Sequence, residues 1–272
     1  MFNTPIFQLN NISVKLEYKN PAGSIKDRPA LFMIQDALKR GFKEIVEVTS
    51  GNTGIALAFY AAKFGIKATI FMPESFSLER QRLLKLYGAN LILTKGSISE
   101  SLNEALTYAK EKNALYTNQF SNPLNAKAQE ITAFEILNQI QKIDCFVAGV
   151  GSGGTLTGIA RVLKPLGTKI VAVESKNSPV IYNKIYCKNL PVKPHKIQGI
   201  GAGFITDITD LSLIDEVVLI DDEEALEFTK KLPKLGITGG ISTAANILAA
   251  QKFNANTVTV APDGIEKYIS IL

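Results

Sequence analysis

Short apolar segments alternate with amphipathic segments along most of this chain, and that alternation constrains its fold more than any other feature. The apolar segments have the length of strands, and the amphipathic segments repeat their apolar residues at helical spacing. We expect strands at residues 44–48, 67–72, 90–94, 145–150, 169–174, 216–220 and 257–261. We expect helices at residues 30–40, 54–64, 78–87, 102–112 and 156–163. This order predicts an α/β fold with a mostly parallel, doubly wound sheet.

Two of the predicted strands are apolar almost throughout. Residues 145–150 read CFVAGV, and residues 170–173 read IVAV. Strands that are buried on both faces have this composition, so we expect both to lie in the centre of a sheet. The pattern contains no fixed-period repeat and no long linker, and by itself it does not divide the chain into domains.

Composition and charge narrow the class of protein. The chain has 272 residues, of which 46% are hydrophobic and 20% are charged, as is typical of a globular protein. The formal net charge is +5 and the lysines are spread along the chain, so nucleic acid is not an expected partner. No segment approaches the roughly 18 unbroken apolar residues of a membrane span, and the N-terminus lacks a signal-peptide pattern. We therefore expect no membrane partner and a cytoplasmic location.

Cysteine and histidine are scarce. Cys145 and Cys187 form no CxxC pair, so neither a disulfide framework nor a metal cage is expected. His195 is the only histidine, and it lies in a loop-like Pro-His-Lys context. A catalytic triad or a zinc site with several histidines would have to use it. We interpret His195 as structural and expect no metal.

A turn-rich segment at residues 20–29 leads into the first predicted helix and contains Lys26. A lone lysine is most often a solvated surface charge. Only a desolvated amine is well suited to form a Schiff base, so the role of Lys26 depends on its neighbours.

A polar turn follows the predicted strand at 44–48. It reads TSGNTG and contributes Thr49, Ser50, Asn52 and Thr53 at the start of a helix. Ligands of open α/β sheets bind at such strand ends, and hydroxyl, amide and helix N–H groups together suit a carboxylate. The alternative is a simple capping turn, because these residue types favour helix starts.

A glycine-rich turn follows the predicted strand at 145–150 and precedes a helix. Glycines let backbone amides close around a phosphate, aided by the positive end of the helix. This turn also fits GxGxxG, and Glu174 lies where a dinucleotide enzyme would hold a ribose, so a nucleotide-binding oxidoreductase is an alternative. A dinucleotide, however, leaves residues 20–28 and 49–54 without a role. The residues predicted to bind phosphate are Gly151, Ser152, Gly153, Gly154 and Thr155.

A further glycine-rich turn, GGISTAA at residues 239–245, opens another helix. Ser242 in this turn is a candidate ligand-binding residue. The alternative is an N-cap, which is the commonest use of a serine at a helix start.

In this order, the four stretches resemble the fold-type II pyridoxal-phosphate enzymes, specifically the cysteine synthases or O-acetylserine sulfhydrylases. The segments that carry the resemblance are NPAGSIKDRPA, TSGNTGIALA, NQFSNP, GSGGTLTGIAR and HKIQGIGAGF. The resemblance implies two doubly wound, mostly parallel sheet domains like those of the tryptophan synthase β subunit. It implies a smaller, mobile substrate-binding domain at 20–122 and a larger cofactor-binding domain at 1–19 and 123–272.

The resemblance also implies roles for individual residues. Lys26 would carry pyridoxal 5′-phosphate and act as the catalytic base, Asn52 would contact the phenolic oxygen of the cofactor, and Ser242 its pyridine nitrogen. Residues Gly151, Ser152, Gly153, Gly154 and Thr155 would bind its phosphate. Residues Thr49, Ser50, Asn52, Thr53 and Gln119 would hold the amino-acid substrate.

The implied reaction is a β-replacement that makes L-cysteine from O-acetyl-L-serine and sulfide through an aminoacrylate. A serine hydroxyl near the pyridine nitrogen has no negative charge to hold a proton there, and this favours loss of a β-leaving group over a long-lived carbanion. The alternatives are related β-elimination or replacement enzymes: cysteine desulfhydrase, cystathionine β-synthase, O-phosphoserine sulfhydrylase, and serine or threonine dehydratase.

The sequence departs from the family pattern in several places. Its N-terminal segment is shorter, Thr206 replaces a usual proline, and Asp263 lies where serines near the pyridine ring are expected. The role of Asp263 is open. The resemblance also implies a homodimer and, as a further partner, the C-terminal tail of serine acetyltransferase.

Overall fold

The structure is a computed structural model that describes residues 2–49, 51–74, 78–95 and 98–272. Contacts divide the chain into two compact units. The larger unit comprises Met1–Ile25 and Ala126–Leu272, and the smaller unit comprises Lys26–Asn125. The prediction that residues 20–122 form a mobile substrate-binding domain concerns function and motion, and it stays a prediction.

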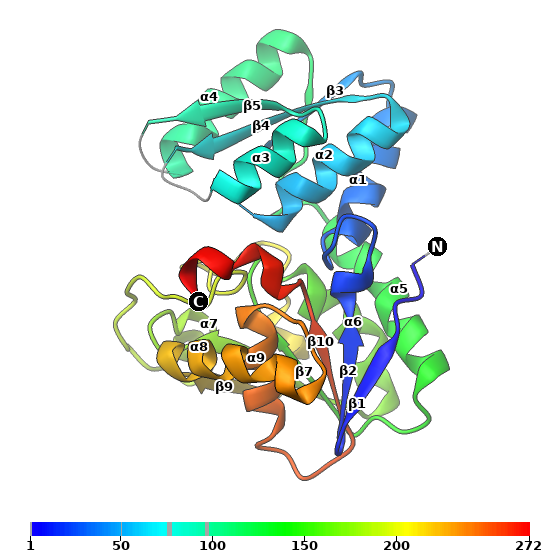
Figure 1. The fold of residues 1–272 in the computed structure, drawn as a ribbon, viewed down its shortest axis with the longest axis vertical. Helices are drawn as coiled ribbons and strands as arrows, with labels where there is room; N and C mark the ends of the chain where they lie inside the picture. Colours follow the sequence, from blue (N-terminus) through cyan, green and yellow to red (C-terminus); the bar gives the residue numbers. More distant parts are fainter. Residues whose placement is uncertain (1, 50, 75–77, 96–97) are drawn as a thin grey trace. The chain divides into compact units, whose positions relative to one another are not determined.

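The larger unit contains a six-stranded sheet (Figure 1). Its strand order is β1-β2-β10-β7-β8-β9, and every neighbouring pair is parallel except β1 and β2. The strands are β1 (Ile6–Leu9), β2 (Ile12–Leu16), β7 (Cys145–Gly149), β8 (Lys169–Ser175), β9 (Glu216–Ile220) and β10 (Thr257–Ala261). The helices are α5 (Leu124–Gln139), α6 (Gly154–Leu163), α7 (Val180–Ile185), α8 (Asp222–Lys231) and α9 (Ile241–Ala250), of which α5 begins in the smaller unit. The strands expected to be central, β7 and β8, are interior.

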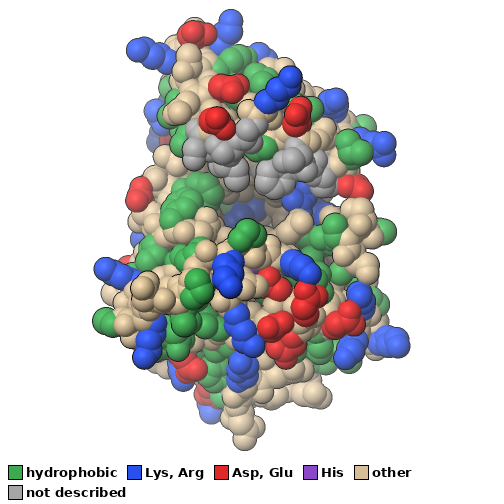
Figure 2. Space-filling model, turned by 90° about the vertical axis from the view of Figure 1, so that its left-hand side faces the viewer, with side chains coloured by type: hydrophobic (Ala, Val, Ile, Leu, Met, Phe, Trp, Pro, Cys, Tyr) green, Lys and Arg blue, Asp and Glu red, His purple; other side chains and the backbone are tan. Residues whose placement is uncertain are grey.

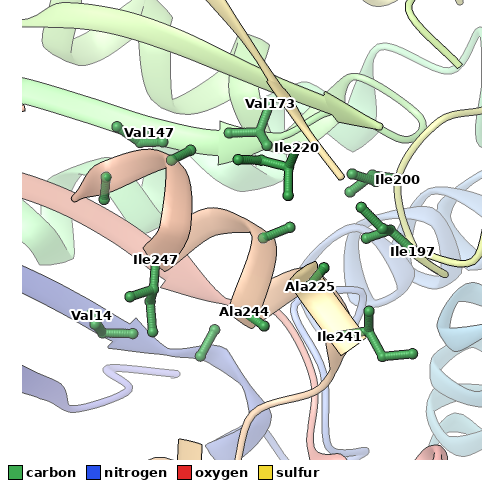
Figure 3. Packing of buried hydrophobic residues seen from close by; sticks show 14 of the residues in the cluster. Val14, Val147, Val173, Ile197, Ile200, Ile220, Ala225, Ile241, Ala244 and Ile247 are labelled. Atoms are coloured by element: carbon green, nitrogen blue, oxygen red, sulfur yellow. The ribbon is translucent and has the colours of Figure 1, made fainter. Parts of the chain in front are cut away.

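Two hydrophobic clusters lie on the two faces of this sheet. Val147 and Val173 belong to the cluster that packs against Ala244 and Ile247 of α9 (Figure 3). The next residue along β7, Phe146, belongs to the other cluster, which includes residues of α5 and α6. Successive side chains of a strand point to opposite faces, so one apolar strand supplies both clusters.

The hairpin of β1 and β2 was not predicted from the sequence. Asn10 has φ 53°, and the register pairs Leu9 with Ile12, so Asn10 and Asn11 form a two-residue turn. Lys15 interrupts the apolar pattern of β2 but is fully buried. Its ammonium lies 2.8 Å from the Glu135 carboxylate on α5, so a tertiary ion pair compensates for burial of the charge.

The smaller unit contains a four-stranded, all-parallel sheet of order β5-β4-β3-β6. Its strands are β3 (Glu44–Val48), β4 (Lys67–Pro73), β5 (Asn90–Thr94) and β6 (Leu115–Tyr116), and its helices are α1 (Asp27–Lys39), α2 (Asn52–Phe64), α3 (Leu78–Leu86) and α4 (Ile98–Lys112). Val46 and Val48 of β3 cluster with Ala105 and Ala109 of α4. Helices α1 and α2 lie on the opposite face of the sheet (Figure 1).

The predicted α/β fold class with parallel sheets is confirmed. Each predicted strand and helix is present, with ends that differ by a few residues. Within the described ranges, no helix is long and apolar enough to cross a membrane. On the face drawn in Figure 2, basic side chains do not gather into one patch, as the spread of lysines in the sequence led us to expect.

Candidate active site

The N-terminus of α6 is the predicted phosphate site. Gly153 is the N-cap of α6, with φ 84°, and no side chain of a described residue caps the helix. The first N–H groups of a helix have no partner within it, and they carry the positive end of its dipole. An anion with several acceptor oxygens therefore fits at this helix start.

Close backbone packing explains why this loop is rich in glycine. A Cβ atom on Gly151 would lie 2.5 Å from the carbonyl oxygen of Gly199, and one on Gly153 would collide with the Thr209 hydroxyl. The Thr206 hydroxyl donates to the Ser152 carbonyl at 2.8 Å. The segment that contains Gly199 and Thr206 thus packs directly on the loop, and Thr206 has a structural role there.

Ser242 lies close to the same segment. It is the second residue of α9 and is 2% exposed. A Cβ atom on Gly199 would lie 3.7 Å from the Ser242 hydroxyl oxygen. Ile200, next to Gly199, is anchored in the core beside α9 (Figure 3). Gly199 therefore connects Ser242 to the phosphate loop within the larger unit.

The N-cap interpretation of Ser242 is wrong. Gly240 is the N-cap of α9 and makes no side-chain capping bond. No described residue hydrogen-bonds the Ser242 hydroxyl, which is therefore able to bind a ligand atom. Asp263 lies nearby: it is 1% exposed, its carbonyl accepts from the Gly240 N–H at 2.9 Å, and its carboxylate accepts from the Tyr268 hydroxyl at 2.5 Å. Asp263 thus braces the start of α9.

The N-terminus of α2 is the predicted carboxylate site. Gly51 is the N-cap, Asn52 is the first helical residue, and no capping side chain is found in the described part of the chain. The Thr49 hydroxyl accepts from the Gly51 N–H at 3.2 Å, so Thr49 shapes the turn instead of capping α2. Ser50 lies outside the described residues.

Gln119 joins this loop from a distant part of the sequence. The Thr53 hydroxyl donates to Gln119 Oε1 at 2.6 Å, and Gln119 is 8% exposed. Because Oε1 is used as an acceptor, the Nε2 group has its two hydrogens available as donors. Two predicted substrate-binding residues that are far apart in sequence are therefore paired in the smaller unit.

Lys26 is the first residue of the smaller unit. It is the N-cap residue of α1 and follows Ile25, whose N–H donates to the Pro262 carbonyl at 2.8 Å. Burial lowers the pKa of the Lys26 ammonium to about 8, because loss of water disfavours the charged form. Its side chain keeps some exposed area. A larger neutral fraction at physiological pH makes the amine a better nucleophile and base.

Comparison with known proteins identifies the family. The pyridoxal-phosphate dependent enzyme family matches residues 1–263. Cysteine synthase A of Escherichia coli (strain K12) is 44% identical over 98% of this chain and 91% of that protein. The chain belongs to the cysteine synthase family. Its cofactor is accordingly pyridoxal phosphate, and the resemblance seen in the sequence is confirmed.

Solved structures agree with membership of the cysteine synthase family. Cysteine synthase from Entamoeba histolytica matches with a TM-score of 0.89 and 38% identity over 98% of this chain and 87% of that chain. A hydrogen sulfide-producing enzyme from Fusobacterium nucleatum matches with a TM-score of 0.91 and 38% identity, over 98% and 95% of the two chains.

The residues present fit the cofactor of the family. The start of α6 offers uncapped backbone N–H donors to a phosphate, and Gly151 and Gly153 let the adjoining loop pack closely on Gly199 and Thr209. Ser242 offers a buried hydroxyl to a ring nitrogen. Lys26 offers an amine that is partly neutral at physiological pH, as condensation with an aldehyde requires.

The dinucleotide alternative is not supported. The Glu174 carboxylate accepts from the N–H groups of Ile181 and Tyr182 at 2.9 and 2.8 Å. It therefore holds the start of α7 and does not face an open ribose site. The family match likewise indicates pyridoxal phosphate and not a dinucleotide.

Sequence reasoning missed Glu47, the partner that holds Gln119. Its carboxylate accepts from the Gln119 N–H at 3.1 Å and from the Thr117 hydroxyl at 2.7 Å. The one signal in the sequence is an acidic residue inside the strand EIVEV, followed directly by the TSGNTG turn. Its partners Thr117 and Gln119 follow β6, about seventy positions away, and local sequence does not reveal them.

Proposed function

We propose that this member of the family makes L-cysteine from O-acetyl-L-serine and sulfide, with Lys26 as its catalytic residue. The sequence identity to cysteine synthase A over nearly the whole chain supports this choice of reaction. The lowered pKa of the Lys26 amine supports its assignment as the catalytic residue. When bound, pyridoxal phosphate supplies an aldehyde for amine condensation and a ring that draws electrons from the substrate Cα.

Each half of the site has a defined task in this proposal. Lys26 binds the cofactor between turnovers, and its Nζ then removes the Cα proton of the substrate. The α6 N-terminus holds the phosphate through the loop at Gly151, Ser152, Gly153, Gly154 and Thr155. Ser242 orients the ring by a hydrogen bond from its hydroxyl, which leaves the ring nitrogen without a carboxylate partner and favours loss of a β-leaving group.

The substrate α-carboxylate is held at the start of α2. Thr49, Thr53 and Gln119 supply polar groups there, and the uncapped helix end supplies N–H donors. By the same proposal Ser50 binds substrate, and Asn52 contacts both substrate and cofactor. A smaller mobile domain, a homodimer, a cytoplasmic location and binding of the serine acetyltransferase tail complete the proposal.

A second candidate function is release of sulfide from cysteine. The Fusobacterium neighbour is a hydrogen sulfide-producing enzyme, and its chain is covered more completely than that of the Entamoeba cysteine synthase, 95% against 87%. Both reactions need a lysine base and a carboxylate site. They differ in whether the sulfur compound enters or leaves.

The two functions are separated by measuring both directions in the purified holoenzyme. We expect kcat/KM for cysteine formation from O-acetylserine and sulfide to exceed kcat/KM for sulfide release from cysteine by at least about tenfold, a transition-state difference of about 1.4 kcal/mol. The reverse order would assign the second function. Failure to form cysteine from O-acetylserine, O-phosphoserine or serine would contradict the proposal.

A further inference from the structure

Glu47 is a fully buried carboxylate near the end of β3, and it accepts hydrogen bonds from several described groups. Val48 N–H donates to Oε1 at 2.9 Å. The Thr117 hydroxyl and the Gln119 N–H donate to Oε2 at 2.7 and 3.1 Å. Tyr116 adds a side-chain hydrogen bond. Two of these donors are backbone N–H groups, which cannot act as acceptors.

This donor set matches an ionised carboxylate. A carboxylate only accepts hydrogen bonds, whereas a protonated carboxyl must also donate one. A proton on Oε2 would compete with the hydrogens of Thr117 and Gln119. Charge-assisted hydrogen bonds are also about twice as strong as neutral ones. Protonation of Glu47 would therefore loosen the segment that contains Gln119.

Gln119 is held by three contacts within the smaller unit. Glu47 holds its N–H, Asn125 Nδ2 donates to its carbonyl at 2.8 Å, and Thr53 holds its side-chain Oε1. We propose that Glu47 is a positioning residue which, as a carboxylate, holds Gln119 in the conformation that binds the α-carboxylate of the substrate. This inference rests on the proposed role of Gln119 in substrate binding.

The protonation state of Glu47 changes near neutral pH. Burial raises the pKa of its carboxyl to about 7, and the hydrogen bonds offset only part of that rise. The carboxylate form is present above this pH and is lost as the pH falls through it. Substrate affinity should follow the same direction, because only the carboxylate holds Gln119 firmly.

Two ionisable groups near Glu47, Tyr116 and Glu44, keep one charge state across this pH range. Burial raises the pKa of Tyr116, so its hydroxyl stays protonated and able to donate. Glu44, at the other end of β3, pairs with Lys67 at 3.1 Å, and its pKa is lowered. The charged and titratable residues on α1 and α2, which lie on the Glu47 face, are Asp27, Arg28, Asp36, Lys39, Tyr60 and Lys63.

The test measures binding of L-serine, which shares the α-carboxylate and α-amino groups of the substrate. Calorimetric dissociation constants are compared at about pH 6 and pH 8 for holoenzymes of wild type, Glu47→Gln and Gln119→Ala. Titration of the serine amine affects wild type and the variants equally. It therefore cancels when each variant's dissociation constant is divided by that of wild type. Glu174→Gln is the matched control, because Glu174 is also buried and accepts two backbone N–H groups.

We expect Glu47→Gln to bind L-serine about tenfold more weakly than wild type at pH 8 and about equally at pH 6. With a pKa near 7, the competent fraction of wild type itself falls about tenfold between these pH values. The Glu174→Gln control should bind L-serine as wild type does at both pH values. At saturating substrate, kcat of Glu47→Gln should stay within about threefold of wild type, because Glu47 does not touch the reacting atoms.

Each outcome has a distinct meaning. If Gln119→Ala binds L-serine as wild type does, the proposed role of Gln119 fails. If Gln119→Ala binds weakly but Glu47→Gln matches wild type at pH 8, the inference about Glu47 is overturned. If Glu47→Gln does not fold, Gln119→Ala still decides. The dissociation constant of Gln119→Ala for L-serine, divided by that of wild type, must then shrink from pH 8 to pH 6. A ratio that stays constant overturns the inference.

Discussion

At the scale of single residues, burial acts in opposite directions on two ionisable groups of the smaller unit. It lowers the pKa of Lys26 to about 8 and raises that of Glu47 to about 7. In both cases loss of water favours the neutral form. Lys26 thereby gains a larger fraction of neutral amine, whereas Glu47 must be charged to hold Gln119 by its accepted hydrogen bonds. The smaller unit thus loses some stability in order to keep a carboxylate at this position.

That cost predicts how stability depends on pH. The Glu47 pKa is raised from 4.5 to about 7, so folding favours its protonated form. The contribution is fully present below about pH 4.5 and is lost as the pH rises through 7. Relative to Glu47→Gln, which does not titrate, wild type should lose on the order of 3 kcal/mol of unfolding free energy over this range. Urea unfolding at several pH values measures the difference, and a difference that stays constant would contradict the assigned pKa.

At the scale of elements, three helices begin on a glycine N-cap without a capping side chain in the described structure. These are α2, α6 and α9, which begin after Gly51, Gly153 and Gly240. A glycine N-cap costs a helix only about a few tenths of a kcal/mol relative to a capping side chain, and it leaves the first N–H groups available to a ligand. The proposal gives a reason, because a carboxylate and a phosphate would take the place of the cap at α2 and α6.

A single methyl group tests the role of the α6 start. Gly153→Ala puts a Cβ onto the Thr209 hydroxyl and forces alanine to φ 84°. We expect it to bind pyridoxal phosphate at least about tenfold more weakly and to lose about 1–3 kcal/mol of stability. Gly167→Ala is the matched control, since Gly167 has φ 88° but open space around its Cβ position. Equal cofactor affinity in the two variants, by absorbance titration, would show that the α6 start does not bind the phosphate.

At the scale of the whole molecule, the sequence pattern predicts the parallel strands because they are apolar runs between amphipathic helices. Their division into two sheets was expected only from the family resemblance. It misses β1 and β2, where Gln8, Ser13 and Lys15 break the apolar pattern, and the burial of Lys15 depends on Glu135 far along the chain. The sequence also identifies the predicted ligand loops through their glycines, which the structure explains by close backbone packing.

What the sequence does not reveal about the site is tertiary. Gln119 pairs with Thr53 through its side chain and with Glu47 through its backbone N–H, and both pairings join segments about seventy residues apart. The capping residues of α2 and α9 also emerge only from the backbone, since Thr49 and Ser242 are equally good capping types by composition.

Lys26 is the residue on which cofactor binding and catalysis depend in the proposed function. Borohydride reduction of the holoenzyme, followed by peptide mass analysis, locates the lysine that is joined to pyridoxal phosphate. We predict modification at Lys26 in wild type, with none in Lys26→Ala, whose turnover should fall at least about a hundredfold because it lacks the base. Lys39→Ala, an exposed lysine on α1, should behave as wild type. Modification at another lysine, or wild-type turnover by Lys26→Ala, would contradict the account.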